Sequence, residues 1–100
     1  MLHIVNKSPY ENNALNSCIK HVNEGDSILL IEDATVAVIK NSSFSEQIFD
    51  VIRDKKLYVL SADLYARGIT EEKVITGVEY VDYEGFVDLT VENSPIQSWL

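Results

Sequence analysis

The sequence predicts an α/β fold, a small three-layer sandwich around a four- or five-stranded, mostly parallel sheet. Short apolar segments of strand length recur along the chain, and segments with the apolar spacing of helices separate them. Strands that alternate with helices favour parallel pairing through right-handed crossovers. A length of 100 residues and a hydrophobic fraction of 46% suit one core, and no linker or repeat divides the chain. We therefore expect one domain over residues 1–100.

The first two elements are a strand and a capped helix. Leu2 to Val5 is short and apolar, as in a buried strand. Ser8-Pro9-Tyr10-Glu11 has the pattern of a helix start, with Ser8 as N-cap and a glutamate three residues later. We expect this helix to run to about Asn23, with Gly25 as a left-handed stop. Its apolar stripe consists of Tyr10, Ala14, Leu15, Cys18, Ile19 and Val22.

The middle of the chain predicts a central strand and a second helix. Ser27 to Ile31 is continuously apolar, as in a strand buried on both faces, and Glu32-Asp33 ends it. Ala34 to Ile39 fits a strand or a short helix over the sheet, and propensity favours the strand. Phe44 to Arg53 predicts a helix capped by Ser43 or Ser45, with its apolar side chains inward: Ile48, Phe49 and Ile52.

Two more strands follow, each leading into a helix. Leu57 to Leu60 predicts a strand, and Ala62 to Ala66 predicts one or two helical turns that stop at Gly68. Val78 to Val81 predicts another strand. A cap at Asp82 then begins a last helix that carries Phe86, Val87 and Val91.

The C-terminal segment Ile96-Gln97-Ser98-Trp99-Leu100 stays apolar to its end. Trp99 and Leu100 fit two interpretations equally well. They could cover the core, or they could lie in a subunit contact, where Trp is enriched.

The charge balance restricts the class of partner. Sixteen acids against eight bases give a net charge of −8, and the only adjacent basic pair, Lys55-Lys56, lies next to Asp54. Proteins that bind nucleic acid neutralise its phosphates with Lys and Arg side chains, so we expect no direct nucleic-acid contact. No apolar run reaches a membrane span, no secretory signal is visible, and one cysteine allows no internal disulfide. We therefore expect a cytoplasmic protein without a membrane segment.

Sites in parallel sheets lie beyond the carboxyl ends of the strands. The first strand–helix turn, Asn6-Lys7-Ser8-Pro9, has no glycine, which argues against a phosphate cradle and a nucleotide cofactor. His3, His21 and the adjacent Glu32 and Asp33 lack ligand spacing, so we expect no metal site. The residues predicted at the carboxyl ends are Asn6-Lys7-Ser8, Glu32-Asp33, Ser61-Ala62-Asp63 and Asp82-Tyr83.

Cys18 is the only residue in this pattern suited to covalent chemistry. A reactive cysteine needs a nearby base or a helix N-terminus to lower the pKa of its thiol. Cys18 lies mid-helix, where the helix dipole gives little help, although His21 at i+3 is close enough to share a face. The apolar stripe around Cys18 equally predicts a buried core residue, because free cysteine is among the most buried residue types.

Taken together, several segments resemble the TusB/DsrH family over essentially the whole chain, in order and with matching spacing. The segments that carry the resemblance are Met1 to Tyr10, Asn16 to Lys20, Glu24 to Asp26, Leu29 to Ala34, Leu57 to Gly68, Val81 to Leu89 and Gln97 to Leu100.

The resemblance implies a DsrE/DsrF/DsrH-like fold and a subunit of a dimer of heterotrimers, with TusC/DsrF-like and TusD/DsrE-like partners. It implies a TusB-like role in a sulfur relay that receives persulfide sulfur indirectly through a small carrier and passes it toward 2-thiolation of the tRNA wobble uridine. The principal sulfur-carrying cysteine of the family belongs to the TusD/DsrE partner. The comparable stretch here, Leu60-Ser61-Ala62-Asp63, has no cysteine, so this chain is expected not to be catalytic alone.

Three alternatives stay open. The chain could be the DsrH subunit of a DsrEFH complex in dissimilatory sulfur oxidation. Cys18, which matches a cysteine of DsrH and of some TusB-like proteins, could be an accessory persulfide acceptor. The domain could also self-associate through the Trp99 surface without any sulfur chemistry.

Overall fold

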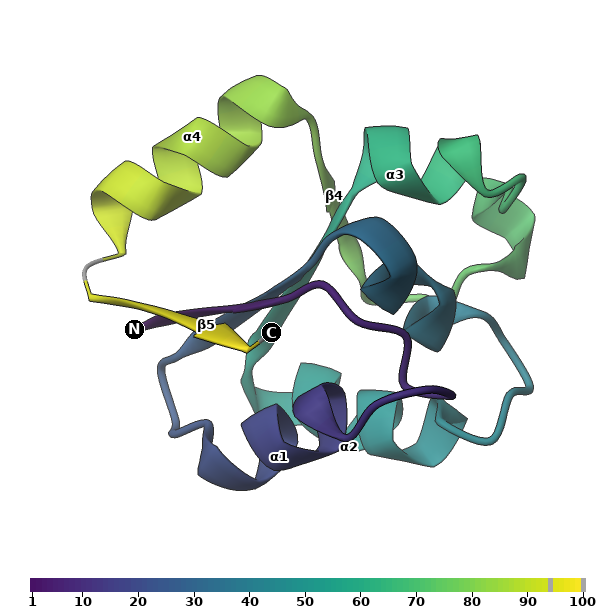
Figure 1. Cartoon of the computed structure of the whole chain (residues 1–100), viewed down its shortest axis with the longest axis horizontal. Helices are drawn as coiled ribbons and strands as arrows, with labels where there is room; N and C mark the ends of the chain where they lie inside the picture. Colours follow the sequence, from purple (N-terminus) through teal and green to yellow (C-terminus); the bar gives the residue numbers. More distant parts are fainter. Residues whose placement is uncertain (94, 100) are drawn as a thin grey trace.

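A five-stranded, all-parallel sheet forms the centre of the protein (Figure 1). The computed structural model describes residues 1–93 and 95–99. The strand order is β4-β3-β2-β1-β5, so the last strand lies beside the first and forms an edge of the sheet. The strands are β1 (Leu2–Val5), β2 (Ser27–Leu30), β3 (Lys56–Leu60), β4 (Glu79–Val81) and β5 (Ile96–Trp99).

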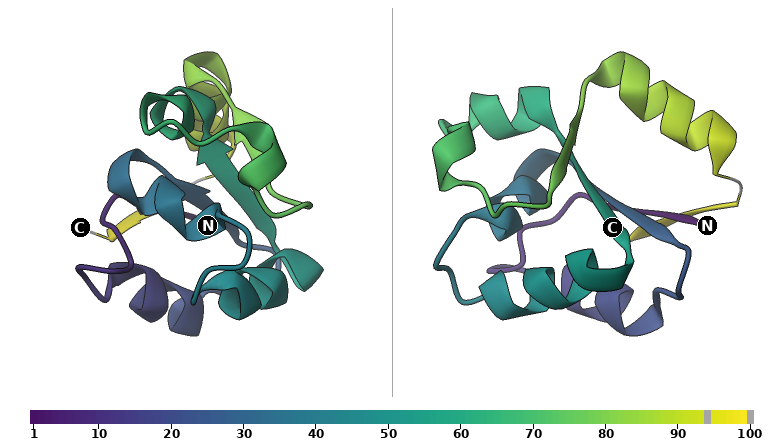
Figure 2. Two further views of the ribbon diagram at one scale, coloured as in Figure 1. Left: turned by 90° about the vertical axis from the view of Figure 1, so that its right-hand side faces the viewer. Right: turned by 180° about the vertical axis from the view of Figure 1, so that it is seen from behind.

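Helices cover both faces of the sheet, which confirms the predicted α/β sandwich (Figures 1 and 2). Helices α1 (Ala14–His21) and α2 (Ser45–Asp54) pack side by side on one face, and α4 (Tyr83–Glu92) crosses the other. Helix α3 (Ser61–Ala66) follows β3 and packs against the 3-10 helix η1 (Glu32–Val38), and a second 3-10 helix, η2 (Glu71–Lys73), precedes β4.

The two faces of the sheet hold cores of unequal size. Alternate residues point to opposite faces of a strand, so Val5 and Ile28 face α1 and α2, whereas Leu2 and Leu29 face α4. The cluster under α1 and α2 extends through η1 and α3 and contains most of the buried side chains, Cys18 among them. Under α4 the buried cluster is only Leu2, Leu29 and Leu89 among the described residues.

The first helix begins later than the capping pattern predicted. Residues 8–12 form turns in which the backbone N–H groups of Glu11 and Asn12 both donate to Ser8 O. Helix α1 starts at Ala14, whose N–H donates to Asn12 Oδ1 at 2.6 Å. The Ser8 cap was therefore wrong, because Ser8 Oγ accepts from Tyr10 N at 3.2 Å only within this turn, and the N-cap of α1 is Asn13. Gly25 has the expected left-handed φ of 90°, but it lies in a separate turn after the helix.

Three further predictions, on one strand and on the second helix, were wrong. Over Ala34 to Ile39 the strand was favoured, but the segment takes the alternative of a short helix and falls mostly in η1, where four of seven side chains are buried. Phe49, expected inward, is 51% exposed, because α2 turns Ile48 and Val51 to the core. Neither Ser43 nor Ser45 caps α2, since its N-cap is Phe44 without a side-chain hydrogen bond.

The remaining elements match the prediction, apart from the C-terminal strand. The Asp82 cap is confirmed, since its Oδ1 accepts from Gly85 N at 2.7 Å, and Gly68 ends α3 with a left-handed φ of 71°. The C-terminal segment forms a strand that was not predicted, and Trp99 packs against the larger core; Leu100 lies outside the described residues. Among the described residues, no helix combines the length and the apolar character needed to cross a membrane.

Candidate functional site

Cys18 lies in the middle of α1 and faces the sheet within the larger core. Its side chain is fully buried, with 0% exposure. Burial, and secondarily the negative charge of Asp26, raises the pKa of the thiol to about 12. In this conformation Cys18 is therefore a protonated thiol without contact to solvent, the opposite of what a nucleophilic cysteine needs.

His21 does not serve Cys18 as a base, although the two share a helix. The side chain of His21 is exposed, and its Nδ1 lies 2.7 Å from Ser17 O, so that a proton on Nδ1 donates to this carbonyl. The imidazole ring tilts against the indole of Trp99 at a centroid distance of 5.5 Å. His21 thus contacts the C-terminal strand and not Cys18.

A polar cluster of His3, Asp26 and Trp99 joins three distant parts of the chain beside the core. Trp99 Nε1 donates to His3 Nδ1 at 3.1 Å, and His3 Nε2 lies 3.0 Å from Asp26 Oδ2. Asp26 also accepts from the backbone N–H of Asn23 at 3.0 Å and from the amino group of Met1 at 3.2 Å. This cluster ties β5 and β1 to the turn before β2.

The donors and acceptors of the cluster fix the tautomer of His3. An indole N–H can only donate, so His3 Nδ1 must be the acceptor and the proton must sit on Nε2. Nε2–H therefore donates to Asp26. Partial burial raises the pKa of Asp26, but the hydrogen bonds from Asn23, His3 and the N-terminal amine outweigh it and lower the pKa to about 2.

Sequence reasoning missed this cluster. The sequence pattern predicts no metal site at His3, and it predicts a core or interface position for Trp99. The available signal was the period of two along β1, which places His3 on the same face as Val5, under α1. A buried imidazole needs polar partners, and the fold supplies them from opposite ends of the sequence.

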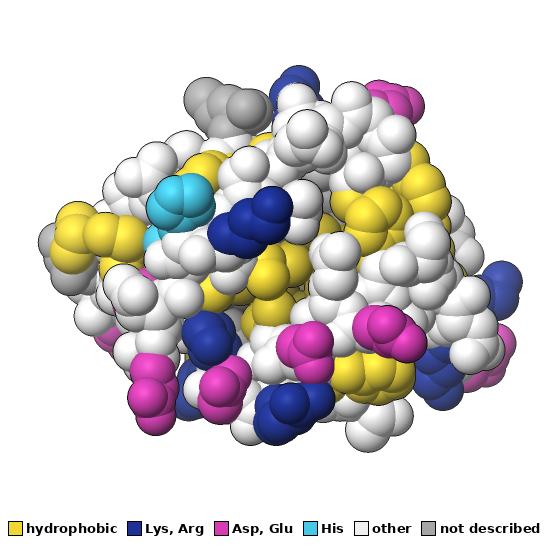
Figure 3. All heavy atoms as spheres, turned by 90° about the horizontal axis from the view of Figure 1, so that it is seen from below, with side chains coloured by type: hydrophobic (Ala, Val, Ile, Leu, Met, Phe, Trp, Pro, Cys, Tyr) yellow, Lys and Arg dark blue, Asp and Glu magenta, His cyan; other side chains and the backbone are white. Residues whose placement is uncertain are grey.

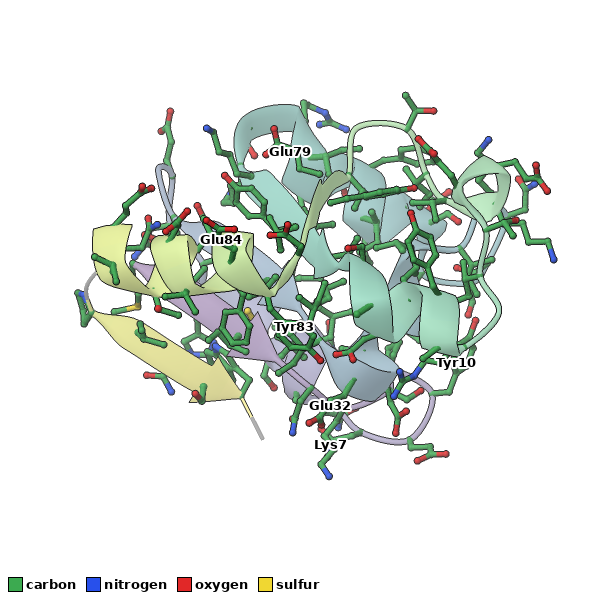
Figure 4. The ribbon with its side chains drawn as sticks, turned by 90° about the horizontal axis from the view of Figure 1, so that it is seen from above. Lys7, Tyr10, Glu32, Glu79, Tyr83 and Glu84 are labelled. Atoms are coloured by element: carbon green, nitrogen blue, oxygen red, sulfur yellow. The ribbon has the colours of Figure 1, made fainter. Side chains whose placement is uncertain are left out.

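The predicted carboxyl ends of the strands do come together. Asn6 Nδ2 lies 3.4 Å from Glu32 Oε2, and the Glu32 N–H donates to Asp63 Oδ2 at 2.7 Å. Figure 4 shows Lys7 beside Glu32 at this edge. Glu32 has a left-handed φ of 51°, a conformation that is costly for a residue with a side chain. The stretch compared with a carrier site, Leu60 to Asp63, contributes the Asp63 carboxylate and Ser61, whose hydroxyl donates to Val81 O at 3.0 Å.

An open groove of about 830 Å³ lies where β1 and β5 end. Tyr10, Asn12 and Asn13 line it from the turns before α1, and Ser98 and Trp99 line it from β5. Ser17 also lines it, but the neighbouring Cys18 does not. The groove therefore gives no route to the thiol. Within residues 1–93 and 95–99, no three His, Cys, Asp or Glu side chains gather as metal ligands.

Comparisons with known proteins cover nearly the whole chain. A family described as "DsrH like protein" matches residues 7–96. The chain is 34% identical to "Protein TusB" of Pectobacterium parmentieri and 31% identical to "Protein TusB" of Shigella flexneri, over 99% of this chain and 100% of each relative.

Solved structures share the fold at low sequence identity. The ychN protein of E. coli superimposes with a TM-score of 0.80 at 18% identity, covering 97% of each chain. The protein of unknown function MTH1491 from Methanobacterium thermoautotrophicum gives a TM-score of 0.73 at 16% identity, covering 97% of this chain and 95% of that one.

Proposed function

The chain belongs to the DsrH family, and from this membership we propose that it is a TusB-like subunit of a cytoplasmic sulfur-relay complex that serves 2-thiolation of the tRNA wobble uridine. The observation that carries the proposal is the likeness to proteins named TusB, at 31–34% identity over 99% of this chain. The proposed role is to hold the complex together rather than to carry sulfur.

The state of Cys18 supports a structural role. Persulfide transfer proceeds by attack of a thiolate on a sulfur atom. The single cysteine of this chain is fully buried, and its thiol has a pKa of about 12. Sulfur transfer in the complex therefore uses a cysteine of a partner, and Cys18 becomes an acceptor only if α1 opens.

The surface charge supports partners that are proteins. The net charge of −8 disfavours direct contact with tRNA phosphates, so the partner subunits and the sulfur carrier bring the relay to the RNA. TusC/DsrF-like and TusD/DsrE-like chains are the partners that we propose.

Co-expression with TusC-like and TusD-like subunits tests the assembly. One stable complex that contains all three chains on size-exclusion chromatography is the expected result. A chain that remains monomeric in the presence of both partners contradicts the proposal. Loss of 2-thiouridine from tRNA after deletion of the gene, measured by nucleoside mass spectrometry, tests the pathway. Unchanged 2-thiouridine would favour the sulfur-oxidation alternative.

A persulfide donor tests the role of Cys18 in the assembled complex. We expect a mass increase of about 32 Da, one sulfur atom, on the partner's cysteine and none on Cys18. An adduct on Cys18 in the native complex would instead establish the accessory-acceptor role.

A further inference from the structure

The exposed surface of α4 carries an apolar row that nothing in the described chain covers. Tyr83, Val87 and Val91 follow one another at intervals of four residues, which places them in line on one side of the helix. Their exposures are 62%, 58% and 76%. Isolated exposed apolar residues are ordinary, but three in line on one helix form a continuous strip about 12 Å long.

An acidic row runs parallel to this apolar row. Glu84, Asp88 and Glu92 each follow one residue behind, and all three are exposed. Helix α4 contains no Lys or Arg. In Figure 4, Tyr83 projects toward the carboxyl ends of the strands, near Glu32 and Lys7, while Glu84 lies on the other side of the helix. The opposite layer of the molecule differs, because Lys, Arg, Asp and Glu intermingle on the surface seen in Figure 3.

The core beneath α4 is also the smaller of the two cores. Among the described residues, only Leu2, Leu29 and Leu89 are fully enclosed there, with half-buried side chains such as Ile4 and Phe86 around them. Parallel sheets are stable when both faces are covered. A partner on the outside of α4 would extend this thin layer.

The acidic row decides which kind of partner fits. In a symmetric contact between two copies, the same patch meets itself, so the acids of one copy would approach those of the other. Like charges opposed across an interface weaken the contact and select against that partner. A different chain with an apolar centre and a rim of Lys or Arg satisfies both rows.

We propose that the α4 strip (Tyr83, Val87 and Val91 with the acids Glu84, Asp88 and Glu92) is the docking surface for a basic-rimmed apolar face of a different subunit. The inference rests on the proposed function for the identity of that subunit, one of the two related chains of the relay complex. It adds which surface binds and what chemistry the partner presents.

Binding of purified wild-type chain to the purified partner pair, measured by isothermal titration calorimetry, provides the reference. The variant V87N/V91N keeps the helix and makes the strip polar, and we expect affinity to fall roughly 100-fold. The matched control is F49N, which changes a comparably exposed apolar residue on α2 and should leave affinity within about threefold.

Charge reversal tests the second half of the proposal. In E84K/D88K we expect affinity to fall roughly tenfold or more and binding to lose its dependence on salt. The control E46K makes the same change at an exposed site on α2 and should have little effect. Thermal unfolding of each variant must match the wild type, since all the changed side chains are exposed.

The outcomes separate this inference from the proposed function. If the wild type binds the partner pair and both α4 variants bind equally well, the docking surface is wrong while the proposed function stands. If the wild type binds neither partner, both fail. If the purified chain forms a homodimer that V87N/V91N abolishes, the strip pairs copies of this chain, and the heterologous assignment is overturned.

Discussion

Replacing Asp26 by asparagine should destabilise the protein in a manner that depends on pH. The variant D26N preserves the size of the side chain but removes the charge that accepts from His3, Asn23 and the amino group of Met1. An amide nitrogen cannot accept, so at least one of these donors loses its partner. The carboxyl group is 12% exposed, so solvent weakens the interactions only modestly.

The magnitude follows from the pKa of Asp26, which falls from an ordinary 3.8 to about 2 on folding. Such a shift contributes about 2 kcal/mol to the free energy of unfolding at neutral pH. Because the pKa is lower in the folded chain, this stabilisation is complete above about pH 5 and is lost as the pH falls toward about 2. At about pH 3 roughly 1 kcal/mol remains.

Urea denaturation followed by Trp99 fluorescence measures the difference between wild type and D26N. We expect about 2 kcal/mol at about pH 5, shrinking to about 1 kcal/mol at about pH 3. Taking the difference cancels the other carboxyl groups. The control D50N makes the same change in a surface pair with Arg53, where both side chains are mostly exposed, and should cost under about 0.5 kcal/mol at either pH. A difference for D26N that is constant between the two pH values would refute the reasoning.

Three further predictions concern Trp99, Cys18 and Glu32. W99F removes the indole N–H and leaves His3 Nδ1 unpaired, so the free energy of unfolding in urea should fall by about 1–3 kcal/mol. Equal stability of W99F and the wild type would show that the Trp99–His3 hydrogen bond does not stabilise the fold. Cys18 should react with iodoacetamide at least about 100-fold more slowly in the native chain than in urea, because its thiol is buried and protonated; similar rates would mean that α1 opens readily. E32G should raise the midpoint of thermal unfolding, because glycine adopts the left-handed φ of 51° without steric strain. We expect the free energy of unfolding to rise by about 0.5–1 kcal/mol. A lower free energy of unfolding would show that the Asn6–Glu32 contact contributes more than the strain costs.

Patterns confined to one element predicted most of the fold. The apolar runs found β1, β2 and β3 to within a residue or two, and the Asp82 cap and Gly68 stop depend on atoms only a few positions apart. The predicted start of the first helix was wrong because Ser8 and Asn12 are both residue types that cap helices, and the path of the turn between them decides where the helix begins. The strand β5 was missed because a short terminal segment with Gln97 and Ser98 at its centre has little strand propensity of its own, and it becomes a strand through its pairing with β1.

The sequence predicted the buried position of Cys18 but not the polar cluster of His3, Asp26 and Trp99. Position in an apolar stripe suggested that Cys18 is a core residue, and its burial agrees with that interpretation. The polar cluster could not be derived, since it joins residues 3, 26 and 99, and no local pattern relates positions so far apart. The topology brings them together, because β5 returns to the edge beside β1.

The same return of the chain explains why the two faces of the sheet differ. To reach the edge beside β1, the chain must cross from β4 over the whole sheet, and α4 is the element that makes this crossing. A single ten-residue helix cannot cover the face as completely as α1 and α2 together cover theirs. The His3–Asp26–Trp99 cluster holds β5 through polar bonds on the face covered by α1, whereas on the opposite face α4 covers only a small core and leaves its outer apolar row exposed. This inequality between the two faces of the sheet is the structural ground for the docking surface that we propose on α4.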